Sequence, residues 1–341
     1  MAWRTRGAQR DRRDTLSRVA GFNGNFATLF TPGTVLQSVQ TDLGLTYGGT
    51  PLATAGNTST TVLTLSGTLT TVPVPIWAKA TNTLAIGAGA TFSVYYDGLG
   101  VTPAMTGVTP TAGVGVALTG AGTGLTLTWA AGTSVNNDSW KATCSALADQ
   151  SGNVVNATQG VASAQPLVAT GLNGVASLLF DGANQFLAYT LALPAPGTTP
   201  TFFWAVWRYM SVQAATRCFN GDTLGSGLLT YLPISASSPQ QFNGSVANAT
   251  AGPAAGNRGR AESYFSNSVG DYLKWGATKT TGANAGNTAP GANRRIADAN
   301  GANRLDMDLL VFVTTNSLPS AAQLAALSAA VTAKYGATVT V

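Results

Sequence analysis

The chain has 341 residues, of which only 9% are charged and 45% are hydrophobic. An ordinary soluble domain carries about 25% charged residues, so neutral residues must form most of this surface. Histidine is absent and cysteine occurs only at Cys144 and Cys218. This excludes histidine-based catalysis and four-ligand zinc sites. The two cysteines can pair as a disulfide or lie apart as small buried side chains, and the sequence does not choose between these states.

Residues 1–45 are predicted to form an extended anchoring arm. The first 20 residues hold six arginines and two aspartates, a net charge of +4 out of +5 for the whole chain. The segment has one aromatic residue before Phe22, and so small a charge gives only modest affinity for phosphates. We therefore expect the arm to bind carboxylates of a partner protein rather than nucleic acid. The contact residues would be Arg4, Arg6, Arg10, Arg12, Arg13 and Arg18.

No apolar run of signal-peptide length follows these arginines, and no stretch of 18 apolar residues occurs that would span a bilayer. We therefore expect no membrane association.

Residues 46–145 are predicted to form a small β-sandwich. Short runs rich in Val, Thr, Leu and aromatic residues are separated by Gly, Pro and Asn at intervals of about 8–12 residues. Apolar and polar residues alternate clearly in Leu125–Trp129. The expected strands are Thr60–Leu65, Val72–Ala78, Thr91–Tyr96, Val114–Leu118, Gly124–Ala130 and Asp138–Cys144.

Residues 146–341 are predicted to form a second, larger β domain that ends in one helix. Residues 276–303 are rich in Ala, Gly and Asn, and we expect a long surface loop there. Ser320 and Gln323 have the spacing of a capping box, and Gly336 would end the helix. The expected strands are Ser177–Phe180, Phe186–Leu191, Phe202–Tyr209, Leu228–Pro233, Ser263–Phe265, Tyr272–Trp275 and Leu305–Thr314.

The order of several motifs in residues 146–341 resembles the concanavalin A-like (LamG, laminin-G-like) jelly roll of lectins and glucanases. The motifs are DQSGN at 149–153, QP at 165–166, LNG at 172–174, FDG at 180–182, DLLVF at 308–312, LPS at 318–320 and KYG at 334–336. Residues 124–133, followed by DSW at 138–140, look like a β-sandwich module of tailed-phage structural proteins. The resemblance implies an all-β fold of two β-sandwich domains, the small sandwich plus a concanavalin A-like jelly roll. An Arg-rich N-terminal arm and one short C-terminal helix would complete it.

Some members of the concanavalin A-like family hydrolyse polysaccharides, which requires two carboxylates about 5–9 Å apart. The alternating acids are Asp306 and Asp308, which would share one face of a strand. We expect these residues to pair with Arg304 or with neighbouring loops rather than to catalyse hydrolysis.

Rim loops of this family often hold calcium, for which Asp149, Asp181 and Asp222 are the candidate ligands. Asp149 and Asp181 lie in turn motifs, so hydrogen bonds to their own backbone are the preferred interpretation. Trp204, Trp207 and Trp275 are expected in the core rather than in a sugar-binding platform, and Phe242, Tyr264 and Phe265 are rim candidates for sugar stacking.

The combination of arm, small sandwich and lectin-like domain looks like a tailed-bacteriophage virion protein. It implies a non-enzymatic structural protein, most simply a capsid decoration protein that is exposed on the virion. Its partners would be the major capsid protein or other virion proteins and further copies of itself, and no cofactor is expected. The alternatives are a tail-fibre or receptor-binding appendage that recognises a surface glycan, and an enzyme acting on cell-wall polysaccharide.

Overall fold

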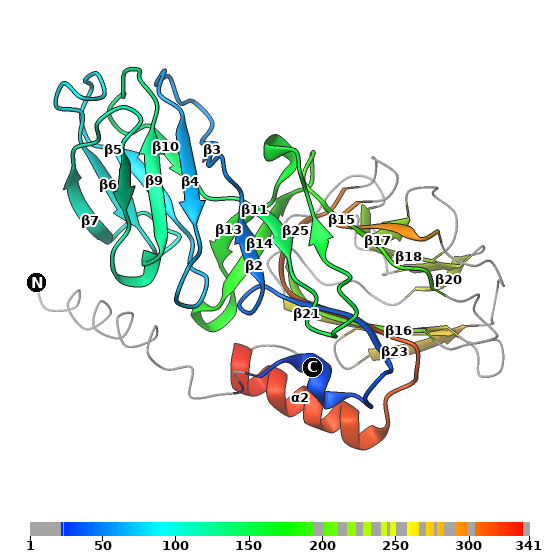
Figure 1. Ribbon diagram of the computed structural model, residues 1–341. Helices are drawn as coiled ribbons and strands as arrows, with labels where there is room; N and C mark the ends of the chain where they lie inside the picture. The colour runs from blue at the N-terminus through cyan, green and yellow to red at the C-terminus, as the bar shows by residue number, and fades with distance from the viewer. Residues whose placement is uncertain are drawn as a thin grey trace, which may run out of the picture.

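The computed structural model describes residues 22, 24–193, 201–210, 291–298 and 304–336, with the strands between residues 217 and 282 described by their backbone apart from Asn220 and Gly221. Within these residues the fold is all-β, with one α-helix near the C-terminus. The strands form two β-sandwiches that lie side by side (Figure 1). None of the described helices is long and apolar enough to cross a membrane.

The large sandwich consists of two antiparallel sheets with a hydrophobic core between them. The eight-stranded sheet contains, in spatial order, β13 (Leu167–Thr170), β14 (Ala176–Asp181), β25 (Asp306–Thr315), β16 (Thr201–Tyr209), β21 (Arg258–Phe265), β22 (Asp271–Trp275) and β23 (Thr278–Gly282), with β1 (Val35–Gln40) also paired to β25. The nine-stranded sheet contains β2 (Leu45–Tyr47), β11 (Cys144–Leu147), β12 (Ala157–Thr158), β15 (Leu187–Thr190), β24 (Asn293–Ile296), β17 (Arg217–Asp222), β18 (Leu228–Leu232), β19 (Gln240–Asn243) and β20 (Val246–Ala249).

Strand β25 organises the large sandwich. One of its edges pairs with β16, and the other edge pairs with β14 at Asp306–Leu309 and with β1 at Val311–Thr315. Strand β1, from the N-terminal part of the chain, therefore pairs with β25, from the C-terminal part. All the residues from Met307 to Thr315 are buried, as expected for a strand that is covered on both faces.

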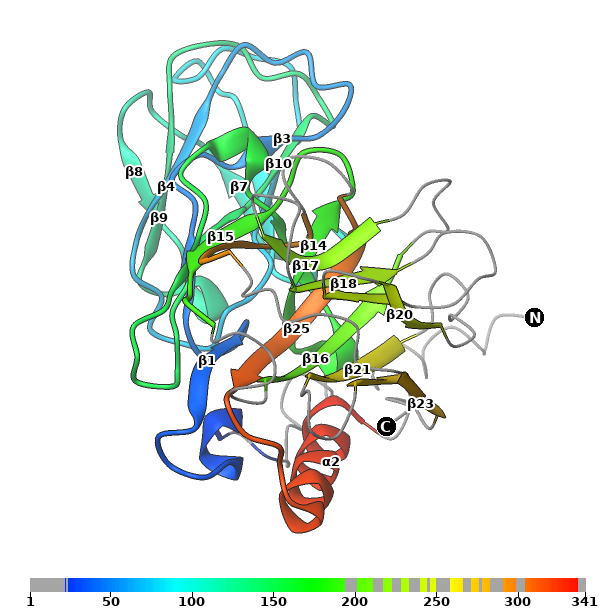
Figure 2. The ribbon, with the colours of Figure 1, turned by 90° about the vertical axis from the view of Figure 1, so that its right-hand side faces the viewer.

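The helix α2 (Ala321–Tyr335) covers the outer face of the eight-stranded sheet (Figure 2). Ser320 and Gln323 form the expected capping box, and the helix ends at Gly336. Leu327, Val331 and Tyr335 are buried with the 3₁₀ turn η2 (Phe26–Leu29) and with Trp204 of β16. These buried apolar residues form the face of the helix that packs against the sheet.

The small sandwich packs a five-stranded sheet against a three-stranded sheet. The first contains β3 (Leu52–Ala53), β10 (Ser139–Lys141), β5 (Trp77–Ala80), β6 (Phe92–Tyr95) and β7 (Pro103–Val108); the second contains β4 (Leu63–Gly67), β9 (Leu125–Trp129) and β8 (Gly115–Ala117). The apolar residues of β9, which alternate with threonines, are buried and point into the core. There the ring centroids of Trp129 and Phe92 lie 5.1 Å apart. Short 3₁₀ turns occur at η3 (Gly120–Gly122), η4 (Ala162–Ala164) and η5 (Leu172–Gly174).

The small sandwich is an insertion into the large one. The chain leaves the nine-stranded sheet after β2 and returns to it in β11, and these two strands pair with each other with Tyr47 opposite Cys144. The insertion therefore begins and ends at neighbouring positions. Cys144 is a buried free thiol, so it is not half of a disulfide, and the Cys218 side chain lies outside the described residues.

The structure differs from the sequence prediction in two segments. The predicted arm 1–45 includes η2, β1 and the start of β2, which belong to the large sandwich, because their apolar residues pack against β25 and α2. The predicted loop 276–303 contains β23 and β24. The sequence of β24, NRRI, is mostly polar and does not indicate a strand, although Arg294 and Ile296 are buried.

Candidate functional site

Charged side chains are concentrated at one end of the large sandwich. Four of the 13 acidic residues and three arginines form a continuous set of ion pairs and strand neighbours there, in a chain with few charges overall. We call this set the charged cluster: Asp181, Asp298, Asp306, Asp308, Arg208, Arg295 and Arg304. The residues come from β14, β16, β24 and β25 and from the segments that adjoin them.

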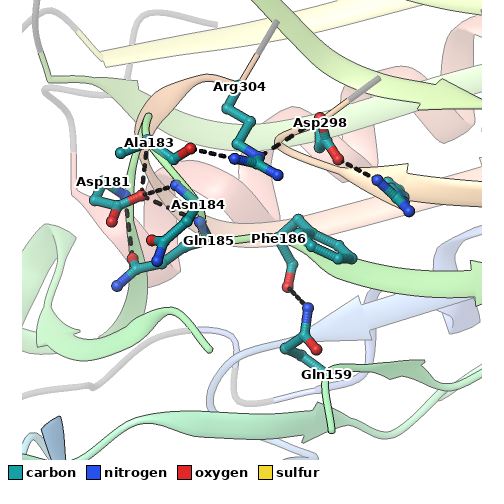
Figure 3. A network of polar contacts seen from close by, with 9 residues as sticks. Gln159, Asp181, Ala183, Asn184, Gln185, Phe186, Asp298 and Arg304 are labelled. Atoms are coloured by element: carbon teal, nitrogen blue, oxygen red, sulfur yellow. Dashed lines mark hydrogen bonds and ion pairs between the residues drawn. The ribbon is translucent and has the colours of Figure 1, made fainter. Parts of the chain in front are cut away.

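Asp181 is held rigidly at the end of β14. Its Oδ1 accepts hydrogen bonds from the amides of Ala183, Asn184 and Gln185 at 2.9, 3.0 and 3.2 Å (Figure 3). Its own amide donates to Oε1 of Gln185 at 3.1 Å. These three hydrogen bonds all end on Oδ1, and the residue is exposed, so Oδ2 lies at the surface of the sandwich.

Asp181 and Asp306 lie directly opposite each other in the β14–β25 register. Directly opposed residues of antiparallel strands have Cβ atoms about 4.5–5.5 Å apart and point to the same face of the sheet. Asp306 is half-buried and Asp181 is exposed, so both residues lie at the surface of the sandwich.

Asp308 follows Asp306 on the same face but has a different environment. It is fully buried, and Arg208 Nη2 on the opposing strand lies 2.6 Å from its Oδ2. The expected pairing was with Arg304 or with neighbouring loops; the structure instead shows an ion pair with Arg208 of the adjacent strand. The Asp308 side chain is therefore enclosed in the sheet next to Asp306 rather than open to solvent.

Asp298 joins two arginines to the turn that holds Asp181. Its buried carboxylate lies 2.6 Å from Arg295 Nη1 and 3.8 Å from Arg304 Nε. Arg304 also donates to the carbonyl oxygen of Ala183 in that turn, as Figure 3 shows. The preceding residue, Ala297, is buried with a φ of 67°, a conformation that costs a non-glycine residue energy. This strained residue places Asp298 between the two guanidinium groups.

The calcium candidates are engaged as turn residues. Asp149 accepts from the amides of Ser38, Ser151 and Val155 at 2.8, 2.9 and 3.1 Å, in agreement with the turn interpretation. Asp181 does the same in its own turn, and the Asp222 side chain lies outside the described residues. Among the described residues no group of three potential ligands has metal-binding geometry.

Several other predicted contact residues cannot be placed. The arm arginines Arg4, Arg6, Arg10, Arg12, Arg13 and Arg18 lie outside the described residues, as do the side chains of Trp275, Phe242, Tyr264 and Phe265. Trp204 and Trp207 are buried in the core, as expected. Asp306 was recognisable from the sequence as one of two alternating acids, but its opposition to Asp181 was not, because the two residues are 125 positions apart.

No protein-family model matches the chain, and no curated protein matches it. Among solved structures it is similar to an arabinofuranosidase in complex with arabinofuranosyl-α-1,2-xylobiose, with 10% identity, a TM-score of 0.49, and coverage of 92% of this chain and 66% of that one. A GH54 α-L-arabinofuranosidase with a cyclic sulfate inhibitor gives 12% identity, a TM-score of 0.46 and coverage of 88% and 63%. A Trypanosoma rangeli sialidase gives 13% identity, a TM-score of 0.40 and coverage of 54% and 30%.

These neighbours correct the function expected from the sequence. The structures named are glycosidases, which contradicts the expectation of a non-enzymatic virion structural protein and its appendage alternative. The chain spans less than two thirds of the length of each of these proteins. At these identities the likeness concerns the fold, so any activity must be argued from this chain's own residues.

Proposed function

We propose that the chain hydrolyses glycosidic bonds, with Asp181 and Asp306 as the two reacting carboxyl groups. The observation that carries the proposal is their direct opposition in the β14–β25 register, with Asp181 exposed and Asp306 half-buried. Glycosidases that retain the anomeric configuration need carboxyl groups about 5–5.5 Å apart. Opposed Cβ atoms at about 4.5–5.5 Å place the carboxyl groups near this separation.

The surroundings suggest different roles for the two residues. Three amides fix Asp181 through Oδ1, so its Oδ2 is positioned to attack the anomeric carbon and form a covalent glycosyl-enzyme ester. Asp306 gives its proton to the departing glycosidic oxygen. It then removes a proton from the water that hydrolyses the ester, which regenerates both groups. Arg208 and the buried Asp308 hold this part of β25 in place.

Arg304 is a positioning residue in this scheme. It links the Ala183 carbonyl in the Asp181 turn to Asp298, so it fixes the turn without touching the reacting atoms. Replacement of Arg304 by Lys keeps the positive charge but removes the planar guanidinium group, which can donate hydrogen bonds to two partners at once. Such a variant is expected to lower kcat while leaving the folded structure intact.

The test is hydrolysis of a panel of aryl glycosides and plant and bacterial polysaccharides by the full chain. Asp181→Asn and Asp306→Asn should each lower kcat by about 10²–10⁴-fold, and NMR of the first-formed product should show a retained anomeric configuration. Asp97→Asn makes the same chemical change in the small sandwich and should keep activity. Absence of turnover on the whole panel, or full activity in both cluster variants, would overturn the proposal.

A further inference from the structure

A cavity lies where the two sandwiches meet, and none of its lining residues belongs to the charged cluster. Its volume is about 270 Å³. The large sandwich contributes residues 42–47, around β2, and the small sandwich contributes residues from β4, β9 and the segment that follows β4. Pockets for small molecules form preferentially at domain boundaries, where two surfaces converge.

The one charged residue at this cavity is already paired. Asp42 lines the cavity, and its Oδ2 lies 2.7 Å from Nζ of the buried Lys334. The other oxygen, Oδ1, is buried and has almost no surface that a molecule in the cavity could contact. The carboxylate therefore balances the charge of Lys334 and is not an acceptor for a ligand.

The remaining lining favours a neutral ligand that is polar on one side. Because Lys334 already balances the charge of Asp42 and no other lining residue is charged, an ionic ligand would lose hydration without gaining a counter-charge. Hydroxyl groups of Thr46, Ser66 and Thr68 are present and make no hydrogen bonds to described residues. The apolar part of the wall comes from Leu43, Leu45, Tyr47, Leu65, Leu69, Pro73 and Leu125.

We infer that this junction cavity binds one unit of a neutral saccharide. A sugar ring has hydroxyl groups at its rim and a C–H face, which match the hydroxyl groups of Thr46, Ser66 and Thr68 on one side and the leucines on the other. The volume is just below the about 300 Å³ at which pockets for drug-sized ligands begin, so the cavity holds a ligand of monosaccharide size. The site is separate from Asp181 and Asp306 and does not depend on hydrolysis.

Two substitutions on one strand form a matched pair. Ser66 and Thr64 are both exposed on β4, two residues apart, and only Ser66 lines the cavity. Ser66→Trp adds an indole at the cavity, whereas Thr64→Trp adds the same group beside it. Neither substitution affects a buried residue, so both variants should fold, and thermal unfolding checks this.

The experiment is saturation-transfer NMR and calorimetry of the full chain with D-glucose, D-galactose and L-arabinose, with glucuronate as the charged comparator. The native chain and Thr64→Trp should bind at least one neutral sugar, and Ser66→Trp should weaken that binding at least 10-fold. Equal binding by Ser66→Trp, tighter binding of glucuronate, or no binding of any neutral sugar would overturn the inference. Loss of binding in Asp181→Asn with Asp306→Asn would also overturn it, by placing the sugar at the charged cluster. Failed hydrolysis alone would affect only the proposed enzyme activity.

Discussion

Tyr47 and Val74 join the two sandwiches through two hydrogen bonds at one phenolic oxygen. Tyr47 Oη donates to the carbonyl of Val74 at 2.6 Å and accepts from its amide at 2.9 Å. Tyr47 belongs to β2 of the large sandwich, and Val74 is buried in the core of the small one. The inserted domain is therefore fixed at a third point besides its two chain crossings, next to the junction cavity that Tyr47 also lines.

Tyr47→Phe should lower the free energy of unfolding by about 1–3 kcal/mol, because the partly buried amide and carbonyl of Val74 would lose their partner. Urea unfolding measures the change. Tyr95→Phe is the control, since the Tyr95 hydroxyl makes no hydrogen bond to described residues, and it should be nearly neutral. Equal stability of the two variants would show that the Tyr47 contact does not stabilise the junction.

Stability should fall above pH 10. Burial raises the pKa of Tyr96 to about 12, and burial also raises the pKa of Tyr47 and of Tyr335, the latter with a further contribution from the charge of Asp42. The unfolded chain loses these protons near pH 10 and the folded chain keeps them. The unfolded state then binds fewer protons, and the free energy of unfolding decreases as pH rises. Chemical denaturation from pH 8 to 11.5 tests this, and Tyr47→Phe should show a shallower decline.

Asp97 should make the small sandwich sensitive to acid. Burial raises the pKa of this carboxyl, but hydrogen bonds from the amides of Leu99, Gly100, Val101 and Thr102 together outweigh it, so that the net pKa lies below the ordinary value of 3.8. The carboxylate therefore stabilises the fold above about pH 4, and this contribution is lost as pH falls below 3.8. The Asp97 loop also requires Gly100, whose φ is +65° and whose Cα faces the Trp77 ring.

Asp97→Ala should cost about 1.5–3 kcal/mol at pH 7, the range for hydrogen bonds to a charged group. The difference from the native chain should shrink as pH is lowered from 4 towards 2, which denaturation at several pH values measures. A difference that does not change with pH would mean that the carboxylate charge is unimportant and that the side chain acts through packing.

Lys334→Met should be more damaging than most single substitutions. Lys334 is fully buried, contacts Asp42 at 2.7 Å, and lies 5.3 Å from the centre of the Phe26 ring. Without the lysine, Asp42 keeps a largely buried charge, and we expect a loss of about 3 kcal/mol. Adding Asp42→Asn to this variant should restore about 1 kcal/mol or more. A double variant that is no more stable than Lys334→Met would contradict a buried ion pair as the cause.

Local patterns in the sequence predicted local structure well. The alternation in Leu125–Trp129 and the cap at Ser320 depend on neighbouring residues, and both are confirmed. Strand β1 was missed because its stability comes from β25, about 270 residues away, and its sequence VLQSVQ lacks clear alternation. Strand β24 was missed because its polar residues acquire partners only after folding.

The candidate site could be predicted only in part. Asp306 and Asp308 were recognisable as alternating acids, but the sequence does not show that Asp306 is half-buried and Asp308 is buried against Arg208. The opposition of Asp181 and Asp306 follows from strand register, which joins distant segments. The place of Asp298 depends on the left-handed backbone at Ala297, which no residue type there would suggest.

The insertion between β2 and β11 has a consequence for the order in which the chain folds during synthesis. The small sandwich is complete once residue 141 has been made, and its contacts are closed within about 90 residues. The large sandwich cannot form completely until β25 has been synthesised, because β1, β14 and β16 all pair with that strand. Domains generally fold as units as they leave the ribosome. The inserted domain should therefore be native while β1 and β14 still expose unpaired edges, a stage at which aggregation is a hazard.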